Sequence, residues 1–513
     1  MKRFLNLLFS KLAFGLLFTF IQFSWVVVML YVATVWTEVI NIGFHILSVI
    51  VALYVIRKTP KPYFKISWIF LILFFPVFGC PCYYVYGRNG VSKNKQLQMR
   101  SVLSQSKEYR QEDTELKELM HTMSTTAWMQ SKYITDFAGY PLCPEHESEY
   151  FSSGESVFPR ILEDIDRAKK YIFLEFFILE PGVMFDTVVD HLEKKAKEGV
   201  HVRLIYDDVG CNQTLPRKYY RKLQAKGIHC ACFNPLSPLL STFMNNRDHR
   251  KILSIDGMIA YTGGINLADE YINEIKRFGY WKDAAIRVTG EAAWSFTVMF
   301  LEMWQYIVKG SAEYERFIPD KKEYQELSPH TGGFLQPFCD SPLEHEDVGE
   351  NVYLNMIYQA NQYVYIFTPY LIISWEMIKA LVNAAKCGVD VRIVTPGIPD
   401  KKTVYWLTQS NYEVLIRGGV KIYRFTPGFI HSKCLVSDDK YAVVGSINFD
   451  FRSFYLHFEC GVFLSQAKAV MSVKEDALKT FEESELVSIE DCEERGFIRQ
   501  MLLSILQLFS PLL

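Results

Sequence analysis

The first ninety residues hold most of the long hydrophobic runs of the chain. The run over residues 12–37 contains no Asp, Glu, Lys or Arg, and about 20 apolar residues suffice to cross a bilayer. A second uncharged run covers residues 39–56, and a third, over residues 66–87, is interrupted by proline and glycine. We therefore predict N-terminal transmembrane helices in residues 1–90, although the second and third runs also fit re-entrant, interfacial or buried core helices.

Basic residues flank these runs and bear on orientation, because positively charged loops tend to stay on the cytoplasmic side. Two crossings followed by a re-entrant third segment would keep every basic cluster on that side. We therefore expect a multi-pass protein of the cell membrane with its catalytic part at the cytoplasmic face. The basic clusters are Lys2, Arg3 and Lys11, then Arg57, Lys58, Lys61 and Lys65, then Arg88, Lys93 and Lys95.

Beyond residue 90 the hydrophobic runs become short and alternate with amphipathic patterns. Residues 107–123 have the pattern of a charged amphipathic helix, so residues 91–135 are predicted to be a solvated connector. In residues 136–325 a buried strand over 171–179 precedes a helix over 188–200. This alternation is typical of an α/β fold.

The α/β pattern occurs a second time, in residues 326–485. AKEGVHVRLI at 196–205 matches AKCGVDVRIV at 385–394, and such self-similarity indicates a structural repeat. The first copy carries about ten extra residues within 236–248, which fit either a substrate-contacting loop or a tolerated surface insertion. Residues 486–513 form an amphipathic tail that could lie in the membrane interface or pack as a core helix.

A short motif repeats in the same register within the two copies. HRKILSID and HSKCLVSD both read His-x-Lys-x-x-x-x-Asp, and each is followed by Gly-x-x-Asn. A single motif of this length is weak, but four positions repeating at one offset of 182 residues are not accidental. The residues related by this offset are His249 and His431, Lys251 and Lys433, Asp256 and Asp438, and Asn266 and Asn448.

The spacing within the motif has a chemical meaning. Residues two apart in a strand share a face, so His249 and Lys251 are expected to point the same way, as are His431 and Lys433. Each motif continues into a hairpin, and the asparagine follows the returning strand. Two facing sets of imidazole, ammonium and amide would form a phosphate site with a nucleophile and an acid. An isolated motif would more often be the polar face of an ordinary hairpin, but the repeat in register favours the functional interpretation.

At these residues the sequence resembles the phospholipase D superfamily, and the wider chain resembles its bacterial cardiolipin synthases. The resemblance implies two similar α/β halves that pack face to face, with the active site on their pseudo-twofold axis. It also implies a phosphatidyl transfer between two phosphatidylglycerol molecules, which gives cardiolipin and glycerol through a phosphohistidine. No cofactor is implied.

The resemblance also implies roles for individual residues. His249 would be the nucleophile and His431 the acid, although a symmetric site makes this assignment reversible. Asp283 would fix the tautomer of His249, and Glu459 that of His431. Binding of the phosphate oxygens would fall to Lys251, Lys433, Asn266 and Asn448.

The two motif aspartates complete the catalytic signature but sit at turn positions. Asp256 and Asp438 end the first strand of their hairpins, where Asp commonly stabilises a turn. We therefore interpret Asp256 and Asp438 as structural members of the motif. Asp283 and Glu459 could alternatively be ordinary partly buried acids.

Composition narrows the function classes. A net charge of −2 and a pI near 6.6 argue against a general nucleic-acid binder, which would usually be strongly basic. The eleven cysteines show no paired or ligand-like spacing, so free thiols are expected. Glu344, His330 and His345 also lack ligand spacing, so no metal site is predicted.

Three functions are compatible with the sequence. A cardiolipin synthase acting on phosphatidylglycerol and membrane lipids is the leading hypothesis. A phospholipase D or a phosphatidylserine synthase of the same superfamily would use water or serine as acceptor instead. A catalytically inactive membrane scaffold is the third, but the intact motif positions argue against it. The oligomeric state and the second lipid substrate are left open by the sequence.

Overall fold

The computed structural model describes residues 20–25, 27, 35–58, 61–87, 93–235, 245–493 and 497–512. It divides into two compact units. One unit contains the described residues up to Lys95, Asn245 and the described residues from Ile498 onward, and the other contains Gln96–Pro235 and Asn246–Phe497.

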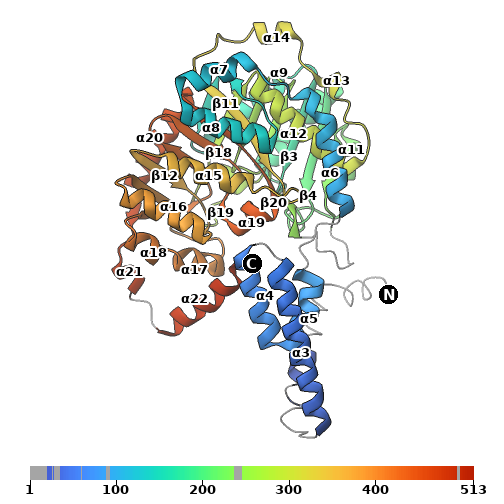
Figure 1. Ribbon diagram of the computed structural model, residues 1–513. Helices are drawn as coiled ribbons and strands as arrows, with labels where there is room; N and C mark the ends of the chain where they lie inside the picture. Colours follow the sequence, from blue (N-terminus) through green and yellow to red (C-terminus); the bar gives the residue numbers. More distant parts are fainter. Residues whose placement is uncertain are drawn as a thin grey trace. The chain divides into compact units, whose positions relative to one another are not determined.

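The smaller unit is helical and largely apolar. Helix α3 (Val35–Lys58) packs against α4 (Pro62–Phe74), which is followed by α5 (Pro76–Cys82) and a π-helix at Tyr83–Gly87 (Figure 1). The C-terminal helix α22 (Phe497–Phe509) belongs here for nearly all its length. The hydroxyl of Ser67 donates to the carbonyl of Leu508 at 2.6 Å, and the rings of Phe70 and Phe509 contact edge to face. The tail therefore packs against α4.

The hydrophobic runs predicted from the sequence differ in how far they form helices. Helix α3 covers the second run, and its residues Thr37–Lys58 are long and apolar enough to cross a membrane. The third run is not one helix, because it breaks between α4 and α5, where Pro76 begins a new helix. Most of the first run lies outside the described residues.

The larger unit contains two sheets, and the first belongs to half 1. Its strand order is β2-β10-β8-β7-β3-β4-β5. Strands β3, β4 and β5 are parallel, whereas β7, β8, β10 and β2 continue the sheet antiparallel. The strands are β2 (Ser148–Phe151), β3 (Tyr171–Phe176), β4 (His201–Asp207), β5 (His229–Phe233), β7 (Ile252–Ile255), β8 (Ile259–Gly263) and β10 (Ala285–Thr289).

The sheet of half 2 repeats this arrangement. Strands β12, β14 and β15 are parallel, and β17, β18 and β20 follow antiparallel in the same order as β7, β8 and β10. The strands are β1 (Cys143–Pro144), β11 (Phe334–Asp340), β12 (Tyr363–Phe367), β14 (Asp390–Pro396), β15 (Lys421–Phe425), β17 (Cys434–Ser437), β18 (Tyr441–Gly445), β20 (His457–Ser465) and β21 (Ser484–Leu486).

Helices cover the outer faces of the two sheets and fill the space beside them. The long helices α12 and α20 each follow the last antiparallel strand of one motif region and pack on the strands next to it. The helices are α9 (Gly154–Arg167), α10 (Val183–Lys197), α11 (Tyr220–Ala225) and α12 (Glu291–Val308) in half 1, and α15 (Val348–Gln359), α16 (Trp375–Lys386), α17 (Lys402–Ser410), α18 (Tyr412–Arg417), α19 (Phe451–Tyr455) and α20 (Lys468–Glu482) in half 2.

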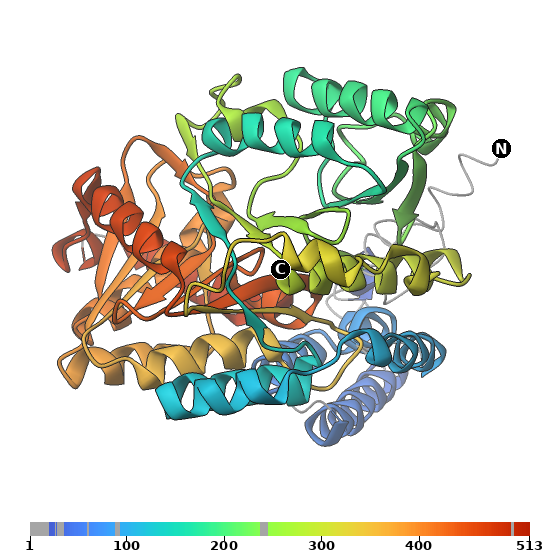
Figure 2. The same ribbon diagram turned by 90° about the horizontal axis from the view of Figure 1, so that it is seen from above.

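The inner faces of the two sheets share one hydrophobic core. Ile252 and Ala260 of half 1 pack in the same buried cluster as Cys434 and Val444 of half 2. Successive side chains of a strand point to opposite faces of its sheet. Cys434 lies in this shared cluster, whereas the next residue, Leu435, lies in the core on the other face. Figure 2 shows half 1, in green, and half 2, in orange, on opposite sides of the unit. The α/β fold with two repeated halves predicted from the sequence is confirmed.

The segment predicted as a solvated helical connector is different in the structure. Residues Lys107–Tyr109 form a 3₁₀ turn, and α7 (Thr114–Met123) begins only after Asp113, whose carboxylate caps the helix by accepting from Leu116 N–H. Leu116 and Met120 are buried in the core of half 2. The segment is therefore part of the compact unit, because its apolar stripe packs instead of facing water.

Candidate active site

His249 follows a very short strand that pairs with the other half of the molecule. Strand β6 (Arg247–Asp248) runs parallel to the start of β20, and the N–H of His249 donates to the carbonyl of Phe458 at 2.9 Å. This places Nδ1 of His249 at 2.9 and 3.1 Å from the two carboxylate oxygens of Glu459. Both side chains are buried.

His431 has the same environment with the halves exchanged. Strand β16 (Gly428–Ile430) runs parallel to β9 (Tyr280–Lys282) of half 1, and the N–H of His431 donates to the carbonyl of Lys282 at 2.7 Å. Nδ1 of His431 lies 2.6 Å from a carboxylate oxygen of Asp283.

The predicted partners of the two histidines were therefore interchanged. Glu459 holds His249, and Asp283 holds His431. The reason is the pairing of the short parallel strands, which crosses between the halves. The assignment implied by the resemblance gave each histidine a carboxylate from its own half, whereas in the structure each imidazole is oriented by a carboxylate from the opposite half.

The surroundings of the histidines keep them neutral with one defined tautomer. Burial lowers the pKa of His249 to about 3 and that of His431 to about 4. Burial acts to raise the pKa of Glu459, but its interactions with His249 outweigh this and hold the pKa below its usual value. An ionised carboxylate can only accept hydrogen bonds, so each Nδ1 carries the proton and each Nε2 offers a lone pair.

The two lysines lie beside the histidines and are almost fully buried. The ammonium groups of Lys251 and Lys433 donate to the backbone carbonyls of His249 and His431, respectively. Burial lowers the pKa of Lys251 to about 8 and that of Lys433 to about 7. The charge on Lys251 further lowers the pKa of both Lys433 and His431. The charges of the two motifs therefore influence one another, and an anion bound beside them would favour the charged lysines.

The two motif asparagines are placed alike but are not equally available. Asn266 accepts from Ile178 N–H at 3.0 Å and donates to the Tyr271 hydroxyl at 2.6 Å. The amide oxygen of Asn448 is buried without a hydrogen-bond partner among the described residues. Asn266 therefore already supports its own half, whereas the Asn448 amide oxygen has unused hydrogen-bonding capacity.

The motif aspartates serve the backbone. The carboxylate of Asp256 accepts hydrogen bonds from the N–H groups of Lys169, Lys170 and Tyr171 at 2.7–2.8 Å, at the start of β3. Asp438 accepts three equivalent bonds at the start of β12. Both aspartates have positive φ, of 53° and 56°. This geometry fastens each hairpin turn to the neighbouring strand, as the structural interpretation expects.

His457 is a site residue that the sequence analysis did not single out. Its ring centroid lies 5.4 Å from that of His249, and its Nδ1 lies 3.6 Å from a carboxylate oxygen of Glu459. His457 and Glu459 are two apart in β20 and so share a face. The His-x-Glu spacing in a strand-like segment was the signal that could have revealed it.

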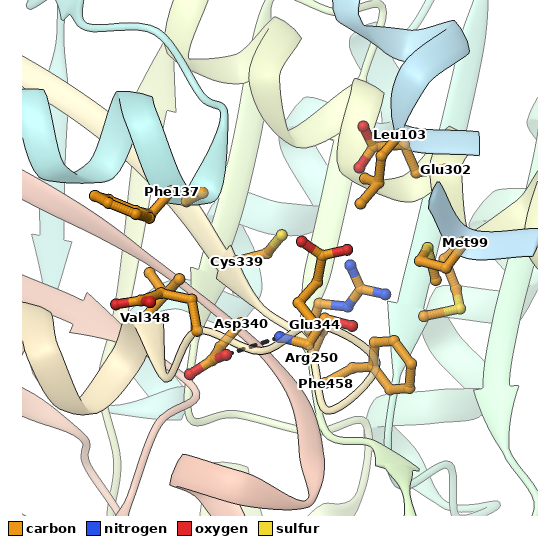
Figure 3. Close-up of a pocket in the computed structure, with 14 residues that line it drawn as sticks. Met99, Leu103, Phe137, Arg250, Glu302, Cys339, Asp340, Glu344, Val348 and Phe458 are labelled. Carbon is orange, nitrogen blue, oxygen red and sulfur yellow. Dashed lines mark hydrogen bonds between the residues drawn. The ribbon is translucent and has the colours of Figure 1, made fainter. Parts of the chain in front are cut away.

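A small cavity lies beside the first motif, next to Arg250 (Figure 3). It has a volume of about 40 Å³ and is lined by Arg250, Glu302, Glu344 and Phe458, among others. Arg250 lies between the motif histidine and lysine in sequence, and its guanidinium pairs with Glu175 at 2.9 Å. None of the predicted site residues lines this cavity. It is therefore distinct from the histidine pair.

Comparison with known proteins gives the same repeat. The sequence profile of the family described as "Cardiolipin synthase, PLD-like domain" matches residues 161–288 and again residues 353–481. A second profile, "Phospholipase_D-nuclease N-terminal", matches residues 46–88. Together with the apolar α3, these matches indicate a membrane protein.

Individual relatives match nearly the whole chain. A Streptococcus mutans protein without a functional name is 40% identical over 464 residues, which cover 90% of this chain and 99% of that protein. A Geobacillus protein named cardiolipin synthase is 31% identical over 475 residues, covering 91% of this chain and 92% of that protein.

Among solved structures, the phosphatidylserine synthase of Haemophilus influenzae superposes with a TM-score of 0.58 at 14% identity. It covers 75% of this chain and 99% of that one, and at this identity the likeness concerns the fold alone. The repeated profile and the relatives above 30% identity, by contrast, show membership. The chain belongs to the cardiolipin synthase family of the phospholipase D superfamily.

Proposed function

We propose that the protein is a cardiolipin synthase, which transfers a phosphatidyl group from one phosphatidylglycerol to another and releases glycerol. The observation that carries the proposal is the pair of buried imidazoles, each held at Nδ1 by a carboxylate and flanked by a buried lysine. The extended match to a protein named cardiolipin synthase supports the choice of reaction within the superfamily.

In the first step, Nε2 of His249 attacks the phosphorus of phosphatidylglycerol and the bond from phosphorus to the glycerol oxygen breaks. Protonated His431 gives its Nε2 proton to that oxygen, so neutral glycerol leaves and phosphatidyl-His249 remains. Burial lowers the pKa of His431 to about 4, so this imidazole must gain its proton when the substrate binds. The negative charge of the bound phosphodiester, together with Asp283, stabilises the imidazolium that the step requires.

In the second step, neutral His431 accepts the proton of a hydroxyl group on a second phosphatidylglycerol. The hydroxyl oxygen attacks phosphorus, the bond from phosphorus to His249 breaks, and cardiolipin forms. The substrates and the products of the exchange contain nearly the same types of bond, so the relative amounts of the lipids set the direction of the reaction. The symmetry of the site permits the reverse assignment, and the family resemblance supports His249 as nucleophile.

Charge that develops on the phosphoryl oxygens is to be stabilised by the two lysines, which supply charge-assisted hydrogen bonds. Asn448 would add a donor from its amide nitrogen. Asn266 can contribute only the N–H that is not engaged by Tyr271. We therefore expect Asn266 to hold its own half of the site in place more than to bind the phosphate directly.

The substrate lipids stay in the bilayer, and we infer a multi-pass membrane unit. Helix α3 has the length to cross. Helix α4 has 13 residues, or about 20 Å at 1.5 Å per residue, which is short of a hydrocarbon core of about 30 Å. A re-entrant α4–α5 segment would keep the basic residues on both sides of it at the cytoplasmic face.

Lipid mass spectrometry on the purified protein in phosphatidylglycerol micelles tests the reaction. Wild type should give cardiolipin and free glycerol, and His249→Ala and His431→Ala should give neither. His330→Ala is the matched control, because His330 is exposed and remote in sequence from both motifs, and it should retain wild-type turnover.

Other products would redirect the proposal. Phosphatidic acid without cardiolipin would indicate a phospholipase D, and phosphatidylserine formed when serine and a liponucleotide are supplied would indicate a phosphatidylserine synthase. No product from any of these donors in a correctly folded protein would support an inactive membrane scaffold.

A further inference from the structure

His457 is an imidazole that the proposed transfer reaction leaves unused. Its side chain is 10% exposed, and its Nδ1 is buried without a hydrogen-bond partner in the part of the chain that the structure describes. That nitrogen lies 3.6 Å from the carboxylate of Glu459. A buried polar atom usually has a partner, so the unsatisfied nitrogen calls for an explanation.

His457 completes a group of three metal-ligating side chains with His249 and Glu459. One ligand atom from each lies within 4.8 Å of the other two. The carboxylate is 2.9 Å from Nδ1 of His249 and 3.6 Å from Nδ1 of His457. A tetrahedral zinc ion with bonds of about 2.0–2.2 Å holds its ligand atoms about 3.3–3.6 Å apart. Small side-chain movements would therefore seat such an ion.

The donor atoms favour a transition metal such as zinc over magnesium or calcium. Two imidazole nitrogens and one carboxylate oxygen are a ligand set that zinc adopts, with a fourth position left for water. Magnesium and calcium prefer sets composed of oxygen. The ammonium group of Lys251 opposes the ion.

We propose that His249, His457 and Glu459 form an inhibitory zinc site that switches off the nucleophile. Zinc would take Nδ1 of His249 in place of the proton now hydrogen-bonded to Glu459. A neutral, zinc-bound imidazole must then carry its proton on Nε2, so one proton changes nitrogen and no electrons are transferred. The lone pair that attacks phosphorus is lost. The inhibition rests on the proposed function, whereas the metal binding does not.

The first test measures zinc binding without reference to activity. Full-length protein carrying Cys387→Ser, which removes an exposed thiol, is titrated with Zn²⁺ against a fluorescent chelator, and Co²⁺ is used to obtain the absorption spectrum of the site. One tight site with a tetrahedral cobalt spectrum is expected. His457→Phe keeps a ring but removes both nitrogens, and it should weaken zinc binding by at least about 100-fold, more than the loss of an outer partner usually costs.

His457→Gln provides a second variant in case the phenylalanine disturbs folding, and circular dichroism checks both. Zinc affinity equal to wild type in either folded variant would overturn the site. If tight zinc binding survived both substitutions, the zinc would bind elsewhere on the chain, and the proposed site would likewise be overturned.

The second test concerns inhibition. The ratio of turnover with zinc to turnover without zinc is measured within each variant, so that changes in basal rate cancel. Wild type should lose at least about tenfold in turnover and recover with a chelator, and the His457 variants should need correspondingly more zinc. Binding that depends on His457 without any inhibition would overturn the switch but keep the site. Binding that depends on His457 in a protein without synthase activity would instead count against the proposed function.

Discussion

At the scale of single residues, each histidine depends on a carboxylate from the opposite half. Glu459→Gln places an amide next to Nδ1 of His249, and its NH₂ group can donate where the carboxylate could only accept. The imidazole can then move its proton to Nε2 and lose its nucleophilic lone pair. Turnover should fall by about 100-fold or more. In Ser-His-Asp triads, a histidine held in the wrong tautomer lowers kcat by up to about 10⁴-fold.

The measurement is cardiolipin formation at saturating lipid, with the KM for phosphatidylglycerol determined alongside. The KM should change little, because Glu459 does not contact lipid in the proposed mechanism. Glu482→Gln is the control, as Glu482 is exposed at the end of α20. A loss below tenfold, or an equal loss in the control, would contradict the positioning role.

The buried lysines predict a conflict between activity and stability. The pKa of Lys433 is about 7 in the folded protein, against an ordinary value of 10.5. Between these values the unfolded chain binds a proton that the folded chain does not, so stability rises with pH across this window. Below pH 7 the folded protein must hold a charged, buried ammonium group. Lys433→Met should therefore abolish turnover yet stabilise the protein, by an amount on the order of a few kcal/mol.

Thermal unfolding in a phosphate-free buffer measures this effect. The Tm difference between Lys433→Met and wild type should be largest at pH 6.5 and shrink towards pH 9.5. Lys379→Met serves as the control, because Lys379 is exposed and its substitution should leave Tm nearly unchanged at both pH values. A less stable Lys433→Met variant at pH 6.5 would refute the prediction.

Residue-level prediction from the sequence succeeded in locating side chains and failed in pairing them. The offset of 182 residues identified His249, His431 and their lysines, because a repeat in register is visible in one sequence. The pairing of His249 with Glu459 spans 210 positions, and it depends on how the halves dock. Nothing local in the sequence encodes that docking.

At the scale of elements, the motif aspartates fasten hairpins to neighbouring strands. Asn tolerates the positive φ of this position, so Asp256→Asn keeps the backbone conformation. The substitution replaces a carboxylate that accepts three backbone N–H bonds by a neutral amide, which accepts them less strongly. The free energy of unfolding should fall by about 1–3 kcal/mol. The kcat per folded molecule should change by less than about threefold, which separates a structural from a catalytic role.

Chemical denaturation and active-site-normalised turnover measure the two quantities. Asp439→Asn is the control, because Asp439 also has positive φ, of 58°, but is exposed. Its surface ion pair with Lys474 should contribute less than about 1 kcal/mol. A large loss of kcat in fully folded Asp256→Asn would indicate that Asp256 takes part in catalysis.

A glycine in the first motif region leaves room for a carboxylate. A Cβ on Gly264 would lie 2.0 Å from Oδ1 of Asp283, which holds His431. The equivalent position in half 2 is Ser446, whose hydroxyl donates to Glu459. Gly264→Ala should displace Asp283 and lower turnover by at least about tenfold, since small misplacements of catalytic groups are costly.

Gly310→Ala is the matched control, because a Cβ there meets nothing within 4 Å. Initial rates of cardiolipin formation, with circular dichroism to check folding, decide the outcome. Wild-type rates in Gly264→Ala would mean that Asp283 can relax without moving His431, and the positioning argument for this carboxylate would fail.

Elements with clear periodicity could be predicted, and the shortest could not. The hairpins after each motif and the parallel strands of each half follow from alternation and β-branched content. Strands β6, β9 and β16 have two or three residues each, which is too short for a periodic signal. Yet these strands carry the backbone contacts that bring each histidine to its carboxylate.

At the scale of the whole molecule, the repeat explains why one site requires both halves. Each half supplies a histidine, a lysine and an asparagine, and also the carboxylate that orients the histidine of the other half. Neither half alone would contain an oriented imidazole. The sequence predicted the two-half architecture through its internal similarity, whereas the membrane unit was less predictable because hydrophobicity alone does not separate a crossing helix from a buried one.

Orientation in the membrane can be tested with a cysteine already in the chain. Among the eleven cysteines, all of which the structure describes, only Cys387 is exposed, and it lies at the end of α16 in the larger unit. If that unit faces the cytoplasm, a membrane-impermeant maleimide should label inverted vesicles and permeabilised cells but not intact cells.

Cys387→Ser should remove most of the label in every preparation, which assigns the signal to this position. The remaining cysteines are at most partly exposed, so their reaction should be slow while the protein is folded. Strong labelling of Cys387 in intact cells would place the catalytic unit outside. The basic residues after α3 would then lie on the side that positively charged loops usually avoid, and the arrangement with a re-entrant α4–α5 segment would have to be abandoned.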